Sequence, residues 1–188
     1  LPLIGTGDWN DAMNSVGDEG RGESVWLGWF LTNTQRRFAE TLKLIGQDEE
    51  ADNLLKSAAE IEKAVEEHGW DGAWYRRAFF DDGTPLGSAI NDECRIDCIS
   101  QAWAAIGGIA DPQRAESALQ AVEKHLVSWE DGVLRLLWPP FSNTVLEPGY
   151  IKGYLAGVRE NGGQYTHAAV WAVWAYACMG LGDMAWKL

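Results

Sequence analysis

The chain has 188 residues, of which 46% are hydrophobic and 23% are charged, and this balance excludes a disordered or fibrous protein. A formal net charge of -13 repels nucleic acids and acidic membrane surfaces, which argues against general polyanion binding but leaves room for one local anion site. Three cysteines, an odd number, and the lack of a charged-then-apolar leader favour a reducing compartment, so we expect a cytoplasmic protein.

Two helices are predicted in the first third of the chain. Residues 23–45 contain no Pro and only one Gly, Gly28, and their apolar residues recur at multiples of helical spacing up to Gly46. Asp48 is expected to cap a second helix, which is amphipathic and ends near Gly69. Both helices therefore need an apolar neighbour on one side.

The middle of the chain predicts a hairpin and two further helices. Residues 70–87 are rich in aromatic residues and contain a turn signal at 81–84, which indicates a short strand and hairpin. Residues 91–106 return to helical spacing. Asp111 is expected to cap the next helix, with Pro112 in its first turn.

The last third of the chain predicts a short strand, a long loop and a buried helix. The strand is expected at 132–137, and the Pro- and Gly-rich stretch 138–159 reads as an extended loop. Residues 164–179 are apolar nearly all round, too short for a membrane span, and typical of a helix that neighbours bury on several sides. A sixth helix is expected to begin near Asp183.

These elements predict an all-α fold. Amphipathic helices alternate with nearly all-apolar ones, and long loops separate the pairs, as in a double-layered (α/α)6 toroid whose inner helices are buried. Six helical segments are about half of such a ring. The chain also starts on Leu1 instead of Met and stops soon after a helix boundary, so we expect 1–188 to be a piece of a longer protein.

Two stretches are more polar and richer in Gly than their apolar flanks. Residues 5–14 form the first, with two acids around a Trp and an Asn, and residues 157–167 form the second, which leads into the last long apolar helix. Polar side chains on loops that rigid helices hold are where binding and catalytic sites are usually built. Eleven tryptophans fit either core packing or the stacking of sugar rings.

Four strings in a fixed order resemble the cellobiose phosphorylase family of inverting glycoside phosphorylases. They are Gly-Thr-Gly-Asp-Trp-Asn-Asp at 5–11, Gly-Glu-Ser-Val-Trp-Leu at 22–27, Asn-Asp-Glu-Cys-Arg-Ile-Asp at 91–97 and Gly-Val-Arg-Glu-Asn-Gly-Gly-Gln-Tyr-Thr-His-Ala at 157–168. Residues 1–7 and 148–154 are most similar to the phosphorylase-like domain of cyclic β-1,2-glucan synthases and to β-1,2-oligoglucan phosphorylases.

The resemblance implies a role for particular residues. Asp11 corresponds to the general acid, Trp9 to a wall of the subsite for the sugar that is cleaved off, and His167 to a phosphate contact. Further substrate contacts are expected at Asp8, Asn10 and Arg76, and further phosphate contacts at Thr166 and Gly163. For Asp8 a structural role in holding the loop is an equal alternative. Ion pairs between helices are the alternative to glucan contacts for Arg76, Arg77, Glu93, Arg95 and Asp97, and Arg159 and Glu160 flank the phosphate loop, where either could orient it. Several disaccharide-specific relatives carry Cys where this chain has Ala12, which favours a β-1,2-glucan over cellobiose.

The chemistry of phosphorolysis accounts for this set of residues. An inverting glycosidase needs a carboxylic acid for the leaving oxygen and a carboxylate that activates water. A phosphorylase needs only the acid, because phosphate is already a nucleophile that an anion site must position. No metal or organic cofactor is implied, and Cys94 and Cys98 do not have the paired spacing of structural zinc ligands.

The expected ligands are therefore a β-glucan oligosaccharide and inorganic phosphate, with α-glucose 1-phosphate as a product. The alternatives are an inverting hydrolase on the same fold and a non-catalytic saccharide-binding or structural half-ring. The resemblance implies that 1–188 is the C-terminal part of one (α/α)6 catalytic domain, so the expected partner is the rest of the parent chain, without which 1–188 should be inactive. Formation of a homo-oligomer stays open. No nucleic acid is expected, and a cyclic glucan synthase parent would be tethered to the inner membrane.

Overall fold

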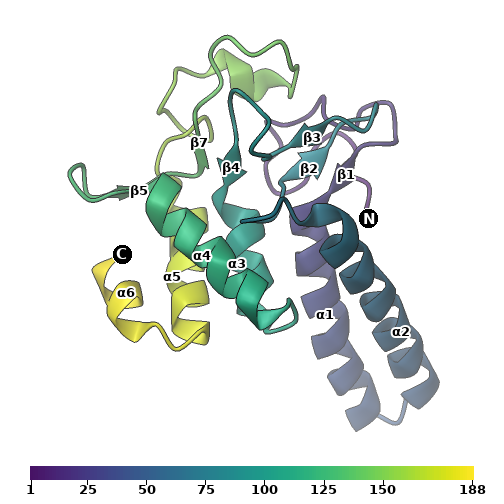
Figure 1. Ribbon diagram of the computed structural model, residues 1–188. Helices are drawn as coiled ribbons and strands as arrows, with labels where there is room; N and C mark the ends of the chain where they lie inside the picture. The colour runs from purple at the N-terminus through teal and green to yellow at the C-terminus, as the bar shows by residue number, and fades with distance from the viewer.

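The computed structural model describes all 188 residues, which form a helical domain with small sheets at one end of the helices (Figure 1). Six α-helices carry the fold: α1 Val25–Leu44, α2 Asp48–Ala64, α3 Cys98–Ile106, α4 Pro112–Leu126, α5 Thr166–Cys178 and α6 Gly182–Lys187. A π-turn, Val65–Gly69, extends α2, and a 3-10 turn, Tyr150–Gly153, lies in the longest loop. The predicted helical class is confirmed, and no helix is both long and apolar enough to cross a membrane.

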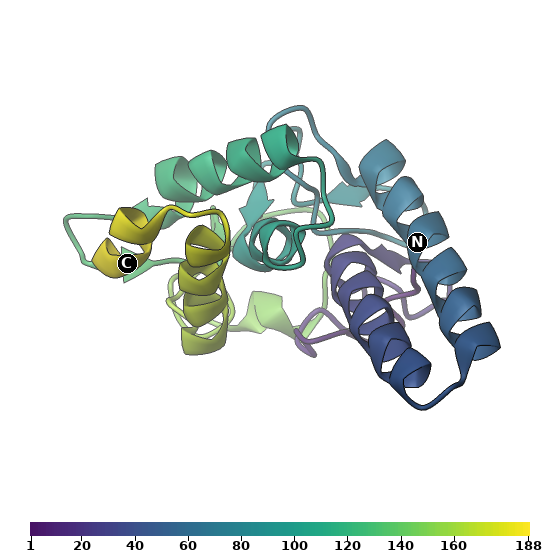
Figure 2. The same cartoon turned by 90° about the horizontal axis from the view of Figure 1, so that it is seen from below.

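The helices pack as successive antiparallel pairs. Each even-numbered helix packs against the helix before it, and α3 also packs against α1 and α5. Figure 2 shows α3 between α1 and α5, with α2, α4 and α6 on the outer side of these three. The amphipathic pattern of α2 and α4 follows from this outer position, because only one side of each helix meets the core.

The strands are two residues long and pair antiparallel. Sheet order β1-β2-β3 joins Glu23–Ser24, Ala78–Phe79 and Pro85–Leu86. The second sheet pairs β4, Ile96–Asp97, with β7, Leu137–Trp138, and the third pairs β5, Val127–Ser128, with β6, Val133–Leu134. These sheets and the long loops gather at the upper end of the helices in Figure 1, so polar loops from distant parts of the chain meet there. The β2–β3 hairpin confirms the turn expected at 81–84.

Two sequence predictions for the middle of the chain are wrong in part. Residues 91–97 are not helical, because Cys94 takes a positive φ of 48° and Ile96–Asp97 pairs with β7. The helix starts only at Cys98, where the Asp97 carboxylate accepts from the Ile99 N–H at 2.9 Å. The strand expected at 132–137 is also split, since its two ends pair in different sheets.

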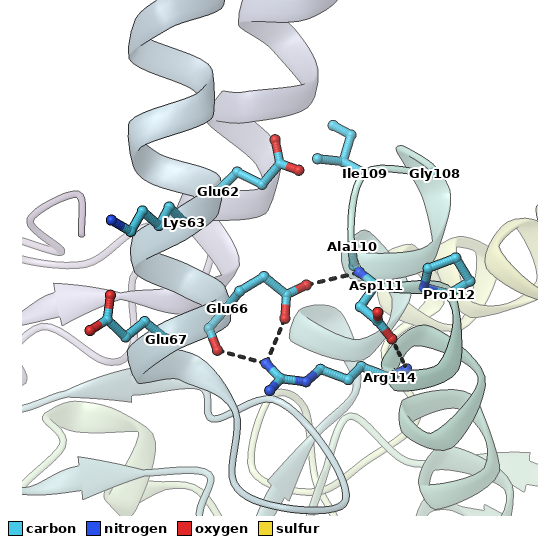
Figure 3. A pocket seen from close by; sticks show the side chains of 10 residues that line it. All are labelled: Glu62, Lys63, Glu66, Glu67, Gly108, Ile109, Ala110, Asp111, Pro112 and Arg114. Carbon is cyan, nitrogen blue, oxygen red and sulfur yellow. Dashed lines mark hydrogen bonds and ion pairs between the residues drawn. The ribbon is translucent and has the colours of Figure 1, made fainter.

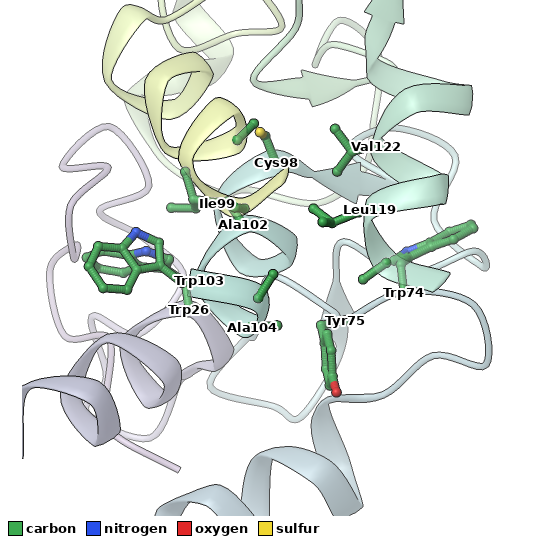
Figure 4. Packing of buried hydrophobic residues seen from close by; sticks show 14 of the residues in the cluster. Trp26, Trp74, Tyr75, Cys98, Ile99, Ala102, Trp103, Ala104, Leu119 and Val122 are labelled. Atoms are coloured by element: carbon green, nitrogen blue, oxygen red, sulfur yellow. The ribbon is translucent and has the colours of Figure 1, made fainter. Parts of the chain in front are cut away.

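The core lies around α3, which is buried at every residue (Figure 4). Helix α5 packs on it through Ala168, Ala172, Ala175 and Tyr176, and the Tyr176 hydroxyl donates to the Leu119 carbonyl of α4 at 2.6 Å. The opposite side of α5 is open, with Val170 58% and Trp174 39% exposed. The expectation that α5 is buried on several sides is therefore wrong within these 188 residues.

The α4 N-terminus offers a test of the helix signals. Asp111 is the N-cap as expected, and its Oδ1 accepts from the N–H groups of Gln113 and Arg114, both at 3.0 Å. We expect Asp111→Ala to lower the free energy of unfolding by about 1 kcal/mol, because two first-turn donors lose their acceptor. Urea denaturation measures this loss. Asp92→Ala, at an exposed acid, is the control and should stay within about 0.5 kcal/mol of the unchanged protein.

Candidate active site

The buried carboxylate of Asp8 fixes the first polar loop, residues 5–14. The two Asp8 oxygens accept from the Arg77 guanidinium at 2.7 and 2.5 Å, and from the Ser24 hydroxyl and the Asn10 N–H at 2.7 and 3.0 Å. The Asp8 side chain is 1% exposed. These contacts favour the structural role for Asp8, since its oxygens are occupied by partners within the protein.

A tight turn then lifts Asp11 to the surface. The Asn10 side-chain oxygen accepts from the Ala12 N–H at 3.2 Å, and the Asn10 carbonyl accepts from the Met13 N–H at 3.0 Å. Asn10, Ala12 and Met13 are buried, whereas Asp11 between them is exposed. The turn thus presents the Asp11 carboxylate and keeps its neighbours in the core.

The loop after β7 lies directly against this turn. The Ile151 N–H donates to the Ala12 carbonyl at 2.9 Å, and the Tyr150 N–H donates to the Asn14 side chain at 3.1 Å. These bonds hold Tyr150 next to the turn that carries Asp11. Partial desolvation, hydrogen bonding to Asp11 and the negative charge of Asp11 raise the pKa of Tyr150.

A second tyrosine joins Asp11 to the other polar loop. The negative charge of Glu160, partial desolvation and hydrogen bonding to Glu160 raise the pKa of Tyr165, and Asp11 acts in the same direction from farther away. Glu160 is only 5% exposed, and its Oε2 atom lies 3.4 Å from the Nε of Arg159. Two carboxylates and two phenols therefore share one site.

Aromatic rings connect the acid loop to the start of α5. The Trp9 ring lies 5.3 Å from Tyr165, 6.1 Å from His167 and 5.4 Å from Trp171, measured between ring centroids. The His167 imidazole stacks on Trp171 at 5.8 Å with an angle of 10° between the planes. Trp9 and His167 thus lie next to each other although they are 158 positions apart in sequence.

The start of α5 has the features of an anion site. Thr166 and His167 are exposed in its first turn, and the preceding Tyr165 makes no side-chain cap. N–H groups of a first turn that lack a cap point outward and favour negative charge. Gly163 lies buried just before this turn, where its carbonyl accepts from the Leu136 N–H at 2.9 Å.

The structure does not bring Arg76 to this site. Its guanidinium pairs with Asp71 at 2.8 Å, donates to the His68 carbonyl at 2.8 Å and lies 5.7 Å from the Phe79 ring. His68 lies in the π-turn after α2, Asp71 in the loop that follows and Phe79 in β2, and no contact of these residues with Asp11 or His167 is observed. The position of Arg76 favours the ion-pair reading over a substrate contact.

Sequence reasoning missed the tyrosines as members of the site. Tyr165 stands two positions before His167, and Tyr150 lies in the string at 148–154 that carries part of the resemblance, so both had a signal. The sequence signal for Trp171 is weaker: it lies one helical turn after His167. Glu160 was recognised only as a residue that flanks the loop.

The largest hollow of the surface is elsewhere (Figure 3). About 740 Å³ in volume, it lies between the end of α2 and the α3–α4 turn, and no residue of the Asp11 site lines it. Two charged side chains that line it, Glu66 and Arg114, bind partners within the protein. Glu66 accepts from the Asp111 N–H at 2.9 Å and from Arg114 at 2.7 Å, and Arg114 lies over the Trp70 ring at 5.1 Å. We assign it to the packing of α2 against α4.

No group of three or more His, Cys, Asp or Glu side chains lies close enough together to hold a metal ion. Cys94 and Cys98 are buried, and burial raises the pKa of both thiols, which makes their thiolate forms unfavourable. The candidate site is therefore built from carboxylates, phenols, a histidine and aromatic rings.

Comparison with known proteins gives a match over the whole chain. The family model described as glycosyl hydrolase 94 superfamily, catalytic domain, matches residues 1–188. Cyclic β-(1,2)-glucan synthase NdvB of Rhizobium meliloti (strain 1021) is 49% identical over 187 residues, which are 100% of this chain and 7% of that protein.

Two relatives from Paenibacillus borealis are phosphorylases. Solabiose phosphorylase is 38% identical over 186 residues, which cover 98% of this chain and 24% of that protein. The 3-O-β-D-glucopyranosyl-β-D-glucuronide phosphorylase is 37% identical over 187 residues, which cover 100% of this chain and 24% of that protein. The chain thus spans between 7% and 24% of the length of these three relatives.

Proposed function

Because the chain belongs to the glycosyl hydrolase 94 superfamily, we propose that it carries the proton donor and part of the phosphate-binding site of an inverting glycoside phosphorylase. The reaction cleaves a β-linked glucan with inorganic phosphate and gives α-glucose 1-phosphate and a shortened glucan. One observation carries the proposal: Trp9 lies next to His167 and two positions from Asp11, so the two polar loops lie against each other.

Asp11 is the proton donor of the proposed reaction. A phosphate oxygen attacks the anomeric carbon as the bond to the glycosidic oxygen breaks, and that oxygen takes the Asp11 proton. Attack from the face opposite the leaving group converts the β configuration to α. The exposed position of Asp11 at the tip of a rigid turn supports this role, because a proton donor must reach the leaving oxygen without moving the loop.

The proposed phosphate-binding residues are His167, Thr166 and Gly163. The first two lie in the exposed first turn of α5, where N–H groups and a polar side chain face the same solvent region. Trp9 and Tyr165, with ring centroids 5.3 Å apart, are the proposed wall for the sugar. Phosphate serves as a substrate in this scheme, and no cofactor enters it.

The substrate and the complete fold are also proposals. The 49% identity to a protein named for cyclic β-(1,2)-glucan and the Ala12 position support a β-1,2-linked glucan. The double row of helices supports an (α/α)6 ring of which 1–188 would be the C-terminal part. Because this chain covers less than a quarter of the length of the phosphorylases that it matches, we propose that it is inactive alone.

Glu160 keeps the hydrolase alternative open. An inverting hydrolase needs a second carboxylate that activates water, and the buried Glu160 carboxylate shares Tyr165 with Asp11. The phosphorylase reading gives Glu160 a different task, to orient Tyr165 and the sugar through hydrogen bonds. The requirement for phosphate separates the two.

We expect the full-length protein to convert a linear β-1,2-glucan to glucose 1-phosphate only when inorganic phosphate is present. The measurement is product analysis by NMR with and without phosphate, and the sugar phosphate should be the α anomer. Free glucose formed at the same rate without phosphate would establish the hydrolase. Binding of the glucan without either product would establish the non-catalytic alternative.

A further inference from the structure

A fully buried guanidinium lies beneath the acid loop. Arg77 precedes β2, its side chain is 0% exposed, and its two terminal nitrogens donate to the two oxygens of Asp8 in a parallel, fork-like pair. Arg77 makes no contact with Trp9 or Asp11 themselves. Its direct route to the acid loop is through Asp8; it also donates to the Ser24 hydroxyl at 3.3 Å and lies 6.0 Å from the Trp26 ring.

Asp8 connects Arg77 to the rest of the loop and to α1 by hydrogen bonds. Its Oδ1 accepts from the Asn10 N–H at 3.0 Å, which fixes the turn that presents Asp11. Its Oδ2 accepts from the Ser24 hydroxyl at 2.7 Å, and the same hydroxyl accepts from the Leu27 N–H at 3.0 Å as the N-cap of α1. The acid loop is thus joined to the start of α1.

The other side of the guanidinium faces the start of α3. The Arg77 Nε lies 3.4 Å from the Oδ2 of Asp97, which is also fully buried, and neither atom has a hydrogen-bond partner. The remaining oxygen of Asp97 caps α3 through the Ile99 N–H. One side chain therefore lies between the N-termini of two neighbouring helices and the loop that carries Asp11.

The charges show that the guanidinium is required for this arrangement. Burial disfavours the Asp8 carboxylate, but the charge and hydrogen bonds of Arg77 outweigh it and lower the pKa of Asp8. For Asp97 burial wins over the attraction to Arg77 and raises the pKa to about 6. Without Arg77, both carboxylates would lie buried and unpaired.

We infer that Arg77 is a positioning residue for the proposed proton transfer, which it serves by holding Asp8 and, through Asp8, the turn that aims the Asp11 carboxyl. This inference rests on the proposed function of Asp11. It concerns geometry, since proton donation depends on a carboxyl held at hydrogen-bond distance from the leaving oxygen. It predicts an effect on kcat larger than any effect on glucan binding.

Arg77→Lys in the full-length protein tests it. Lysine keeps the positive charge between the two carboxylates but cannot form the two parallel hydrogen bonds that fix Asp8. We expect kcat for phosphorolysis to fall at least tenfold while KM for the glucan changes less than twofold. Unchanged kcat in a folded Arg77→Lys protein would overturn the inference.

Asp8→Asn provides a second variant should lysine not be accommodated. It leaves Arg77 facing Asp97 alone, a neutral pair, so folding should be retained. If Arg77 acts through Asp8, each substitution lowers kcat, and the double variant is no slower than the slower single one. Wild-type kcat for Asp8→Asn, or losses that multiply in the double variant, would overturn the inference.

Two controls separate positioning from general destabilisation. Arg114→Lys weakens an ion pair with Glu66 far from the loop, and Leu119→Ala removes a buried side chain from the core. Both should lower the Tm, Leu119→Ala by more than Arg77→Lys, and both should keep kcat within twofold. An equal loss of kcat in these controls would assign the effect of Arg77 to stability.

Asp11→Asn in the same assay separates a failure of the positioning role of Arg77 from a failure of the proposed function. Loss of phosphorolysis in Asp11→Asn together with normal turnover in Arg77→Lys and Asp8→Asn would refute only the positioning role. Normal turnover in Asp11→Asn would refute the proposed function itself.

Discussion

Asp11→Asn is expected to lower kcat for phosphorolysis of a β-1,2-glucan by about a thousandfold, the usual contribution of one general acid. Asparagine has nearly the same shape but no proton to give to the leaving oxygen. The turn should persist, because its hydrogen bonds come from Asn10, Ala12 and Met13 and none uses the Asp11 side chain. KM for the glucan should therefore change little.

The chemical origin of this loss has its own test. With a glucosyl fluoride of β configuration the leaving group needs no proton, so Asp11→Asn should turn over this donor within about tenfold of the wild-type rate. Asp92→Asn, at an exposed acid outside the site, is the matched control and should behave as wild type with both donors. Equal losses with glucan and fluoride would contradict proton donation by Asp11.

His167→Ala is expected to lower kcat/KM for phosphate about a hundredfold, the scale of losing one well-placed group that stabilises a charged reactant. The reason is that His167 lies in the first turn of α5, next to the N–H groups that favour an anion. The loss should appear mainly as a higher KM for phosphate. Initial rates over a series of phosphate concentrations at saturating glucan measure it.

His125→Ala is the matched histidine control. His125 lies near the end of α4 with its ring 5.4 Å from Trp74, and it makes no contact with Trp9 or Trp171. Its removal should leave the phosphate dependence unchanged. If His167→Ala affected KM for the glucan and not for phosphate, the imidazole would belong to the sugar side of the site.

Local signals predicted two helix boundaries well, but the expected cap by Asp48 is wrong, because Asp48 is the first residue of α2 and Gln47 is its N-cap, without a side-chain hydrogen bond. The α1 and α4 boundaries follow from Gly46 after one helix and Asp111 with Pro112 before the other, because caps depend on residues that are neighbours in sequence. The start of α3 was placed too early because it is decided by pairing with Leu137–Trp138, about 40 positions away along the chain. No pattern within residues 91–97 reports that pairing.

Burial of α5 was overestimated for a similar reason. Apolar residues on all sides of a helix indicate neighbours, but only the elements that pack on each side decide exposure. Within this chain α5 packs mainly on α3 and α6, and Val170 and Trp174 stay open.

In the candidate site, the sequence predicts both polar loops but not the contacts that hold them in place. Asp8 was a candidate substrate contact, whereas its partner Arg77 is 69 positions away and was read only as one arginine of an ion-pair region. The sequence predicts a substrate contact for Arg76, yet in extended backbone consecutive side chains point in opposite directions. Arg77 consequently faces the core beneath the loop, and Arg76 faces Asp71.

A structure of the full-length protein with a glucosyl unit and phosphate bound would test the proposed site most directly. The Asp11 carboxyl should lie at the glycosidic oxygen, and phosphate should lie on the opposite face of the same sugar, within hydrogen-bond distance of the His167 imidazole. Phosphate bound elsewhere, or Asp11 and His167 in contact with different sugars, would contradict it.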